Sequence, residues 1–313
     1  MRFLFLFLDG VGLGNDDPEV NPLAKAEMPH LQELLDGKRL LAASAPLITK
    51  RATLTAIDAC LGIPGLPQSA TGQATLITGM NVPQQIGRHY GPKPNHEIRQ
   101  LLEQGSLFSQ LLQRGYTAVL LNAYPESYFD AINSGKRLYS AIPQAVVNAG
   151  IALKTRSDLY QRQALSADFT GLGWRTRLKY NDAPVISEQQ AGELLAELAL
   201  SYDFTFFEYW PSDYAGHRQD EAEALRLLEA FDQVLGGLLA AWDDQQGLVL
   251  LTSDHGNMED LSTRRHTDNP VPALLIGSPE LRSRFTADLH SLADIAPAIL
   301  QFFPRRLPCV SPN

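Results

Sequence analysis

The chain has 313 residues, of which 44% are hydrophobic and 19% are charged, a balance that excludes intrinsic disorder and predicts a substantial buried interior. The net charge of −9 argues against nucleic acid as the main partner, because phosphate backbones are bound by basic surfaces. A small phosphorylated substrate is still compatible with this charge, since a bound metal ion supplies positive charge locally.

The N-terminal stretch MRFLFLFLDGVG is interpreted as a buried first strand rather than a signal peptide. Its apolar run has only about six residues, it ends at Asp9, and no small-residue cleavage site follows. No apolar stretch approaches the ~20 residues of a membrane span. We therefore expect a cytoplasmic protein with no membrane partner.

From the N-terminus onward, apolar strands alternate with segments of helical periodicity. Elements are expected, in chain order, as a strand at 2–8, helices at 28–37, 73–79 and 106–116, a strand at 117–124, a helix at 187–202, a strand at 203–210, a helix at 220–244, and strands at 247–254 and 271–277. Ser187 is the expected N-cap of its helix. This alternation predicts an α/β fold with a mainly parallel central sheet and helices on both faces.

The segment from 124 to 186 does not follow this alternation, and it is rich in Tyr, Arg and Ser. We expect a core made of residues 1–123 and 187–313, interrupted by a small cap or insertion at 124–186 with approximate boundaries.

Three expected strands end on side chains that can bind a metal ion. The first strand ends at Asp9, the strand before PSDYAGH runs into Asp213 and His217, and GLVLLTS runs into Asp254 and His255. Ligands in open α/β sheets bind outside the carboxyl ends of the strands, so these side chains are expected to meet. The four-residue spacing between Asp213 and His217 places both on one face of a helix.

Two further features complete this candidate metal site. Asp254 and His255 would point in opposite directions in a straight strand, so the chain must turn there, and Gly256 favours such a turn. His266 lies in a polar stretch before an apolar strand and is a further candidate ligand. His and carboxylate ligands without thiolate suit Zn²⁺ or Mn²⁺. The two cysteines, Cys60 and Cys309, are interpreted as ordinary thiols, and a disulfide between them stays open.

The stretch LPQSATGQATLITGMN, residues 66–81, offers hydroxyl groups at the start of an expected helix. Backbone N–H groups at a helix start favour an anion, and a serine deprotonated beside a metal ion is a nucleophile. Ser69, Thr71 and Thr75 all qualify by residue type. The alternative is that Ser69 only caps the helix.

At this point the chain resembles the alkaline phosphatase superfamily, and most closely its branch of cofactor-independent phosphoglycerate mutase and phosphopentomutase. The matching pieces are LFLDGVGLG, NPLAKAEMPHL, SATGQATLITG, DYAGH, TSDHGNMED and HTDNPVP, in the family order between residue 5 and about 277. In the mutase pattern Ser-x-x-Gly-His, Ser69 and Gly72 match, whereas Gln73 stands in place of His.

The resemblance implies two divalent metal ions, Zn or Mn, about 4 Å apart. It assigns one ion to Asp213, His217 and His266, and the other to Asp9, Asp254, His255 and the nucleophile Ser69. It also implies a phosphoserine intermediate, which is either hydrolysed or returned to another hydroxyl of the substrate.

The short 124–186 segment favours hydrolysis of a phosphate mono- or diester, because mutases of the family carry a much larger insertion. A phosphomutase acting on a sugar or glycerate phosphate is the alternative, followed by a sulfate or phosphonate ester hydrolase and a non-catalytic member. Basic residues of this segment either bind a second anionic group of the substrate or are solvated surface charges; they are Arg156, Arg162, Arg175, Arg177 and Lys179. Four aromatic residues either form the floor of a substrate pocket or pack in the core: Tyr124, Tyr128, Phe129 and Trp174. The entrance of the site is expected to be lined by Arg88, His89 and Tyr90. The oligomeric state stays open.

Overall fold

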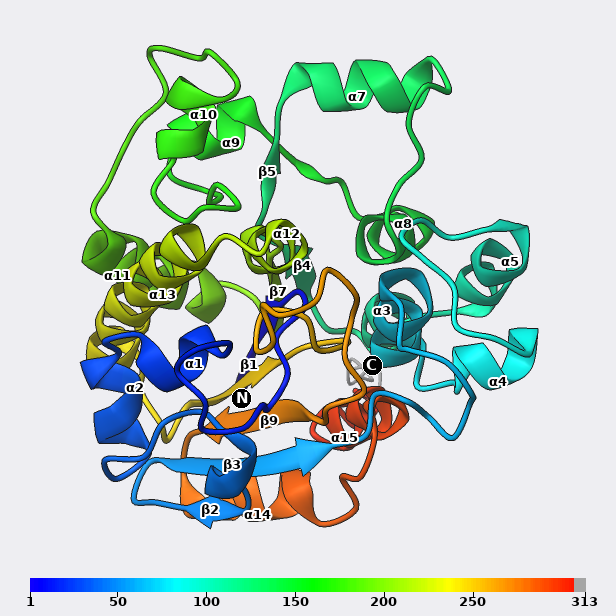
Figure 1. Ribbon diagram of the computed structural model, residues 1–313. Helices are drawn as coiled ribbons and strands as arrows, with labels where there is room; N and C mark the ends of the chain where they lie inside the picture. The colour runs from blue at the N-terminus through cyan, green and yellow to red at the C-terminus, as the bar shows by residue number, and fades with distance from the viewer. Residues whose placement is uncertain (307–313) are drawn as a thin grey trace, which may run out of the picture.

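The computed structural model describes residues 1–306, in which a seven-stranded sheet carries helices on both faces (Figure 1). In order across the sheet the strands are β2 (Leu47–Ile48), β3 (Ala52–Ile57), β9 (Val271–Ile276), β8 (Gly247–Thr252), β1 (Arg2–Leu8), β7 (Phe204–Tyr209) and β4 (Ala118–Leu120). Strands β8, β1, β7 and β4 are parallel, whereas β9, β3 and β2 pair with their neighbours in antiparallel fashion. The α/β class is confirmed, but the sheet is mixed rather than mainly parallel.

The connection between β8 and β9 explains this difference. Neighbouring parallel strands need a crossover connection, usually a helix, and residues 253–270 contain none. β9 therefore runs antiparallel to β8, and β3 in turn runs antiparallel to β9. β3 was not among the expected strands, because Thr53 and Thr55 interrupt its apolar pattern.

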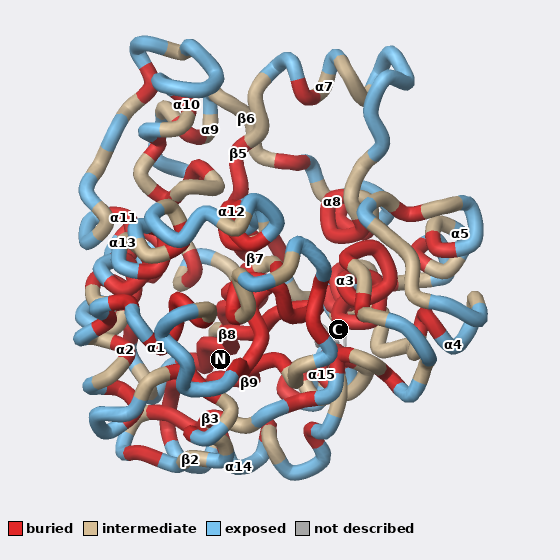
Figure 2. The backbone as a smooth tube through the Cα atoms, in the orientation of Figure 1, coloured by how far each residue is buried: buried red, intermediate tan, exposed pale blue. Residues whose placement is uncertain are grey.

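Side chains of β1 alternate between two hydrophobic cores, one on each face of the sheet. Its leucines at even positions join one core and its phenylalanines at odd positions join the other. The leucine face is covered by α1 (Pro22–Lys25), α2 (Pro29–Leu34), α11 (Glu188–Leu200) and α13 (Glu221–Ala241). The phenylalanine face is covered by α3 (Ser69–Thr78), α4 (Val82–Ile86), α5 (His96–Gln104), α6 (Leu107–Gln113), α8 (Ala141–Asn148), α14 (Pro279–Thr286) and α15 (Ile295–Gln301). Figure 2 shows the sheet and α3 as largely buried.

The helices expected from periodicity are present as α2, α3, α6, α11 and α13. α3 begins at Ser69, four positions before the expected segment begins at Gln73. Ser187 is the N-cap of α11, where its side chain accepts a hydrogen bond from the backbone N–H of Gln190.

A small group of elements stands apart from the sheet at the top of Figure 1, and we name it the cap. It consists of β5 (Ala123–Tyr124), α7 (Glu126–Asn133), β6 (Lys154–Thr155), α9 (Arg156–Tyr160) and α10 (Leu172–Thr176). A separate small cluster of buried side chains, which includes Leu159 and Trp174, holds part of it together. The intervening α8 packs on the core instead, against α3 and α5.

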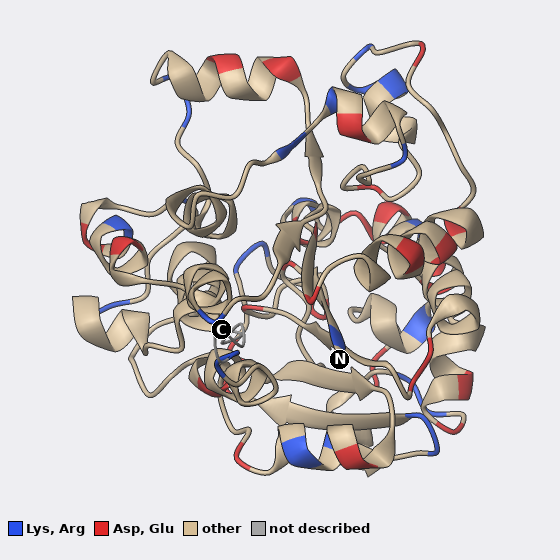
Figure 3. Cartoon of the chain, turned by 180° about the vertical axis from the view of Figure 1, so that it is seen from behind, with Lys and Arg blue, Asp and Glu red and all other residues tan. Residues whose placement is uncertain are grey.

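Charged side chains of both signs are spread over the helices and loops, as Figure 3 shows from behind. Within residues 1–306, no helix has both the length and the apolar composition of a membrane span. Cys60 is half-buried, and Cys309 lies outside the described residues.

Candidate metal centre

Three parallel strands of the sheet end at the same level. Phe7 of β1 lies opposite Thr252 of β8 and Glu208 of β7, so the chain leaves the sheet at neighbouring points. The loops after β1 and β8 start at this edge, and so does the segment after β7 that forms α12 (Pro211–Arg218). They carry Asp9, Asp213, His217, Asp254 and His255.

One group of ligand atoms forms around Asp213. Its Oδ2 atom lies 3.4 Å from His217 Nε2, and its Oδ1 atom lies 3.8 Å from His266 Nε2. The two Nε2 atoms of His217 and His266 are 3.2 Å apart. The helical spacing of Asp213 and His217 brings them together, and His266 reaches them from the loop before β9.

A second group of ligand atoms forms around His255. Its Nε2 atom lies 3.6 Å from Asp9 Oδ1, 3.6 Å from Asp254 Oδ2 and 3.0 Å from Ser69 Oγ. Its ring stacks on that of His266 with centroids 3.7 Å apart, which joins the two groups. All seven candidate residues therefore lie in one site.

The three histidines present their Nε2 atoms to this site in the form a metal ion requires. The Nδ1 atoms contact backbone carbonyls instead: His217 that of Arg264 at 2.8 Å, His266 that of Pro67 at 2.7 Å, and His255 that of Gly256 at 3.3 Å. A carbonyl only accepts hydrogen bonds, so Nδ1 carries the proton and Nε2 keeps its lone pair.

Several carboxylate oxygens of the site lack a hydrogen-bond partner in the described part of the chain. Asp9 Oδ1 and both oxygens of Asp254 are buried and have no hydrogen-bond partner within residues 1–306. Burial together with neighbouring carboxylates raises the pKa of Asp9, and burial raises the pKa of Asp254 to about 7. Asp213 is only partly buried, and the neighbouring His217 ring together with a hydrogen bond from Asn257 lowers its pKa to about 2. Buried carboxylate oxygens without hydrogen-bond partners, beside histidine nitrogens with free lone pairs, are typical ligands of divalent metal ions. The residues of this site therefore fit such ions.

Two glycines make room for side chains of the site, one for a candidate ligand and one for the neighbouring Glu259. Gly10 has a φ of +67°, and a Cβ there would lie 2.6 Å from Asp213 Oδ1. We expected Gly256 to permit a turn through its backbone freedom, but its φ is not in the left-handed region. A Cβ at Gly256 would instead lie 2.0 Å from Glu259 Oε1, so the residue is needed for space.

Sequence reasoning assigned no role to Glu259 or Asn257, although both stand in the TSDHGNMED stretch. Glu259 is buried and accepts hydrogen bonds from Gly12 N–H at 2.9 Å, Asn257 N–H at 2.8 Å, Asn269 Nδ2 at 3.1 Å and the Thr267 hydroxyl. Asn257 Nδ2 donates to Asp213 Oδ1 over 2.7 Å. A buried carboxylate thus joins the loops that follow β1 and β8, and its position just after an Asp-His pair was the available signal.

Ser69 is the first residue of α3, and the N-cap position belongs to Gln68, which makes no side-chain cap. The Ser69 hydroxyl therefore points to His255 rather than to its own helix. The hydroxyl of Thr71 donates to the carbonyl of Gln68, and that of Thr75 donates to the carbonyl of Thr71. Of the three hydroxyl residues considered, only Ser69 contacts the metal-capable side chains.

Gln73, where the mutase pattern has His, faces the same site. Its Nε2 atom donates to Asp9 Oδ2 over 3.4 Å, and its Oε1 atom is buried with no partner in the described part of the chain. The substitution therefore keeps a polar side chain against a candidate ligand.

A cavity of about 560 Å³ opens beside His217 and His266. The three residues expected at the mouth, Arg88, His89 and Tyr90, line it together with Arg265. The basic residues expected to bind a second anion are largely engaged elsewhere. Arg156 pairs with Glu126 and Asp182, Arg177 pairs with Glu223, Arg175 donates to the carbonyl of Ala183, and Lys179 donates to the carbonyl of Thr176.

Comparisons with known proteins point in the same direction as this geometry. The model of the Metalloenzyme superfamily matches residues 175–305. The 2,3-bisphosphoglycerate-independent phosphoglycerate mutase of Agrobacterium fabrum is 34% identical over 139 residues, which cover 41% of this chain and 26% of the relative. The enzyme of the same name from Roseobacter denitrificans is 36% identical over 129 residues, covering 39% of this chain and 25% of the relative. The match spans about a quarter of the length of these mutases.

Solved structures align with nearly the whole chain. The alkaline phosphatase from the Antarctic bacterium TAB5 has a TM-score of 0.57 at 13% identity, over 98% of both chains. The phosphoglycerate mutase of Leishmania mexicana, solved at low cobalt concentration, has a TM-score of 0.50 at 12% identity, over 100% of this chain and 97% of that one. At such identities the likeness shows the fold.

The family match and the fold point to divalent metal ions as the cofactor. In sequence the chain is similar to the Metalloenzyme superfamily over residues 175–305 and to 2,3-bisphosphoglycerate-independent phosphoglycerate mutases over about 40% of its length. In fold it is similar to alkaline phosphatase and to phosphoglycerate mutase.

Proposed function

We propose that the protein is a two-metal phosphoryl-transfer enzyme that hydrolyses a phosphate mono- or diester through a phosphoserine on Ser69. The position of one hydroxyl carries this proposal. Ser69 Oγ stands at the N-terminus of α3, 3.0 Å from His255 Nε2, and has no capping role. The first N–H groups of a helix lack intrahelical partners and attract an anion, so this end of α3 favours a phosphate beside Ser69.

Two divalent ions, Zn²⁺ or Mn²⁺, would be held at the site. One would bind Asp213, His217 and His266, and the other would bind Asp9, Asp254, His255 and Ser69. They would neutralise the charge of the phosphate and favour the Ser69 alkoxide. Ser69 Oγ then attacks phosphorus, and the bond from phosphorus to the leaving oxygen breaks. Water cleaves the resulting phosphoserine, which restores the hydroxyl and releases phosphate from a monoester substrate or a phosphate monoester from a diester substrate. His255 orients the nucleophile, and Gln73 holds Asp9 beside it.

Access of water favours hydrolysis over internal transfer. The side chain of His217 is 44% exposed, and the cavity of about 560 Å³ reaches it together with His266. A mutase must exclude water while its substrate reorients. The cap, which a mutase would use for that purpose, has its basic residues largely tied to acidic and backbone groups of the protein itself.

Phosphomutase activity is the second candidate. The names of the curated relatives favour it, since these mutases are 34% and 36% identical to this chain over about 40% of its length. Its substrate would be a sugar or glycerate phosphate.

The test is turnover of p-nitrophenyl phosphate and bis-p-nitrophenyl phosphate by protein reconstituted separately with Zn²⁺ and Mn²⁺. We expect release of p-nitrophenol to fall at least about 10³-fold in Ser69→Ala, since a lost nucleophile removes the covalent route. The control is Ser283→Ala, an exposed serine of α14.

Each outcome has a defined meaning. Equal turnover in Ser69→Ala and wild type would overturn the role of Ser69. Absence of ester hydrolysis, together with isomerisation of a sugar or glycerate phosphate without release of free phosphate, would establish the mutase instead.

A further inference from the structure

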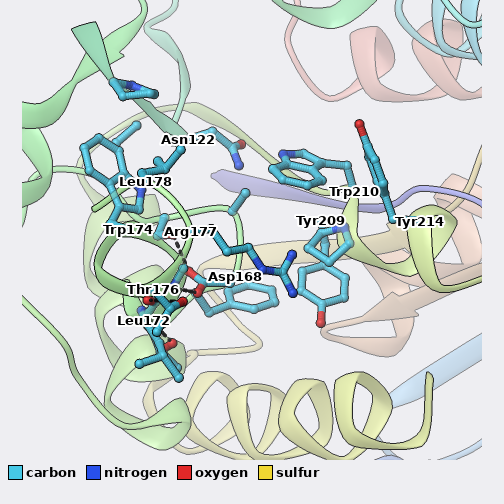
Figure 4. Close-up of a pocket in the computed structure, with 18 of the residues that line it drawn as sticks. Asn122, Asp168, Leu172, Trp174, Thr176, Arg177, Leu178, Tyr209, Trp210 and Tyr214 are labelled. Carbon is cyan, nitrogen blue, oxygen red and sulfur yellow. Dashed lines mark hydrogen bonds between the residues drawn. The ribbon is translucent and has the colours of Figure 1, made fainter. Parts of the chain in front are cut away.

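A second cavity, of about 590 Å³, lies between the cap and the helices α12 and α13. Cap residues Leu172, Trp174 and Leu178 stand on one side of it, and Tyr209, Trp210 and Tyr214 stand on the other (Figure 4). Its wall is therefore dominated by aromatic and aliphatic side chains.

This cavity and the metal centre are built partly from the same elements. Pro211 and Tyr214 line it from α12, the same helix that carries Asp213. On the opposite wall, Asn122 Nδ2 donates to the carbonyl of Glu208 over 2.8 Å, and the Tyr124 hydroxyl donates to Glu208 Oε2 over 3.1 Å. Glu208 lies opposite Phe7 of β1, two residues before Asp9. The cavity and the metal centre therefore share α12 and the C-terminal end of β7.

Apart from Arg137, the arginines of the cavity wall have acidic partners within the protein, and Asp168 has hydrogen-bond donors. Arg177 and Arg226 both pair with Glu223. Asp168 accepts hydrogen bonds from the Ser166 hydroxyl and from the N–H groups of Gly171 and Gly173. Arg137, which lies over the ring of Tyr128, has no acidic partner among residues 1–306. The interior consequently favours an uncharged apolar group rather than a second phosphate.

Two aromatic rings of this wall are open to water, whereas Trp174 and Tyr209 are buried. Tyr214 is 56% exposed and Trp210 is 39% exposed, and the two rings meet edge to face with centroids 5.3 Å apart. Leu172 and Leu178 of the cap are 50% and 43% exposed. Apolar side chains gathered around one concave surface are typical of a ligand pocket, and aromatic rings favour other rings through stacked or edge contacts.

We infer that this cavity binds the leaving group of the substrate, and that this group is an aromatic ring system. The inference rests on the proposed phosphoester hydrolysis. The phosphate stays at the metal centre, the ring lies between Trp210 and Tyr214 on one side and the cap leucines on the other, and the polar cavity at His217 admits water.

The kinetic test compares 1-naphthyl phosphate with phenyl phosphate, whose leaving groups have similar acidity. We expect kcat/KM of the wild type to be about tenfold higher for the naphthyl ester, since its second ring buries additional apolar surface. The preference should fall to about one in Trp210→Ala and in Leu178→Ala. The second variant lies on the cap, away from α12, and so separates loss of the pocket from disturbance of Asp213. Leu112→Ala, a 39% exposed leucine of α6, is the matched control.

The binding test uses 1-naphthol, which has no phosphate, on metal-free protein in a calorimeter. We expect wild type and Leu112→Ala to bind it, and Trp210→Ala and Leu178→Ala to bind it at least tenfold more weakly. If 1-naphthol binds as expected but metal-loaded wild type turns over no ester, the proposed function is wrong and the aromatic pocket is supported. Turnover with no naphthyl preference, together with 1-naphthol binding that is absent or unchanged in both cavity variants, would overturn the pocket and leave the hydrolase standing.

Discussion

The Nε2 atoms of His217 and His266 lie 3.2 Å apart, yet each ring directs its Nδ1 atom to a backbone carbonyl. Two nitrogen lone pairs thus face each other, with Asp213 beside them. Two neutral imidazoles cannot hydrogen-bond in this arrangement. Burial lowers the pKa of His266 to about 4, whereas the contact with Asp213 raises the pKa of His217. A proton on His217 Nε2 or a metal cation between the rings satisfies the pair, and the metal cation also uses the neighbouring Asp213.

Zn²⁺ should therefore stabilise the fold. We expect saturating Zn²⁺ to raise the Tm of metal-free protein by on the order of 10 °C, because a ligand far above its Kd adds about 4 kcal/mol to the free energy of unfolding. His266→Ala should lose most of that rise. The control is His290→Ala, an exposed histidine. Equal Tm shifts in both variants, measured by calorimetry, would contradict the assignment of His266.

Glu259→Gln should weaken metal binding although Glu259 is not a proposed ligand. The carboxylate accepts hydrogen bonds from Gly12 and Asn257, and the amide nitrogen of Gln cannot accept. Loss of such outer partners typically costs 10–100-fold in metal affinity. Zn²⁺ titration followed by calorimetry measures the change. Glu280→Gln, an exposed carboxylate of α14, should bind as the wild type does.

Glu208→Gln should stabilise the metal-free protein at alkaline pH. Burial raises the pKa of Glu208 from 4.5 to about 7, so its contribution to stability is complete below pH 4.5 and is lost as the pH rises through 7. The difference between the two pKa values corresponds to a loss of about 3 kcal/mol from the free energy of unfolding at pH 8. Urea unfolding at pH 5 and pH 8 should show the variant close to wild type at pH 5 and more stable at pH 8. A difference that does not change with pH would contradict the raised pKa.

Gly72→Ala should destabilise the protein, although alanine normally favours a helix interior by about 0.5–1 kcal/mol. A Cβ at Gly72 would lie 2.8 Å from the carbonyl oxygen of Asp254 and 2.9 Å from its Cβ. That contact displaces either α3 or Asp254, so we expect a loss of about 1–3 kcal/mol and weaker metal binding.

The matched control for this substitution is Gly236→Ala in the interior of α13. There the nearest atoms belong to the half-buried ring of His30, a side chain that can move. Urea unfolding should show little change or a small gain for this variant. Equal stability of Gly72→Ala and wild type would mean that α3 does not approach Asp254 so closely.

Much of the site could be read from local patterns. Continuous apolar runs identified β1, β7 and β8 because buried parallel strands lack polar alternation. The residues after them were therefore placed at one edge of the sheet, and the spacing of Asp213 and His217 is a property of any helix. Nothing local revealed β3, since its threonines hide its apolar face, or the reversal of β9, which follows from the absence of a helix in residues 253–270.

Residue types and their order along the chain determined the α/β class, the candidate ligands and the candidate nucleophile. Only the tertiary structure decided that the Ser69 hydroxyl faces His255 while the Thr71 hydroxyl donates to the carbonyl of Gln68. The reason is that each contact depends on which group lies within reach of the hydroxyl. The same holds for Glu259, whose partners come from loops that are distant in sequence, and for the aromatic cavity, whose walls belong to the cap and the core. Such contacts arise from packing between segments, and no periodicity within one segment encodes them.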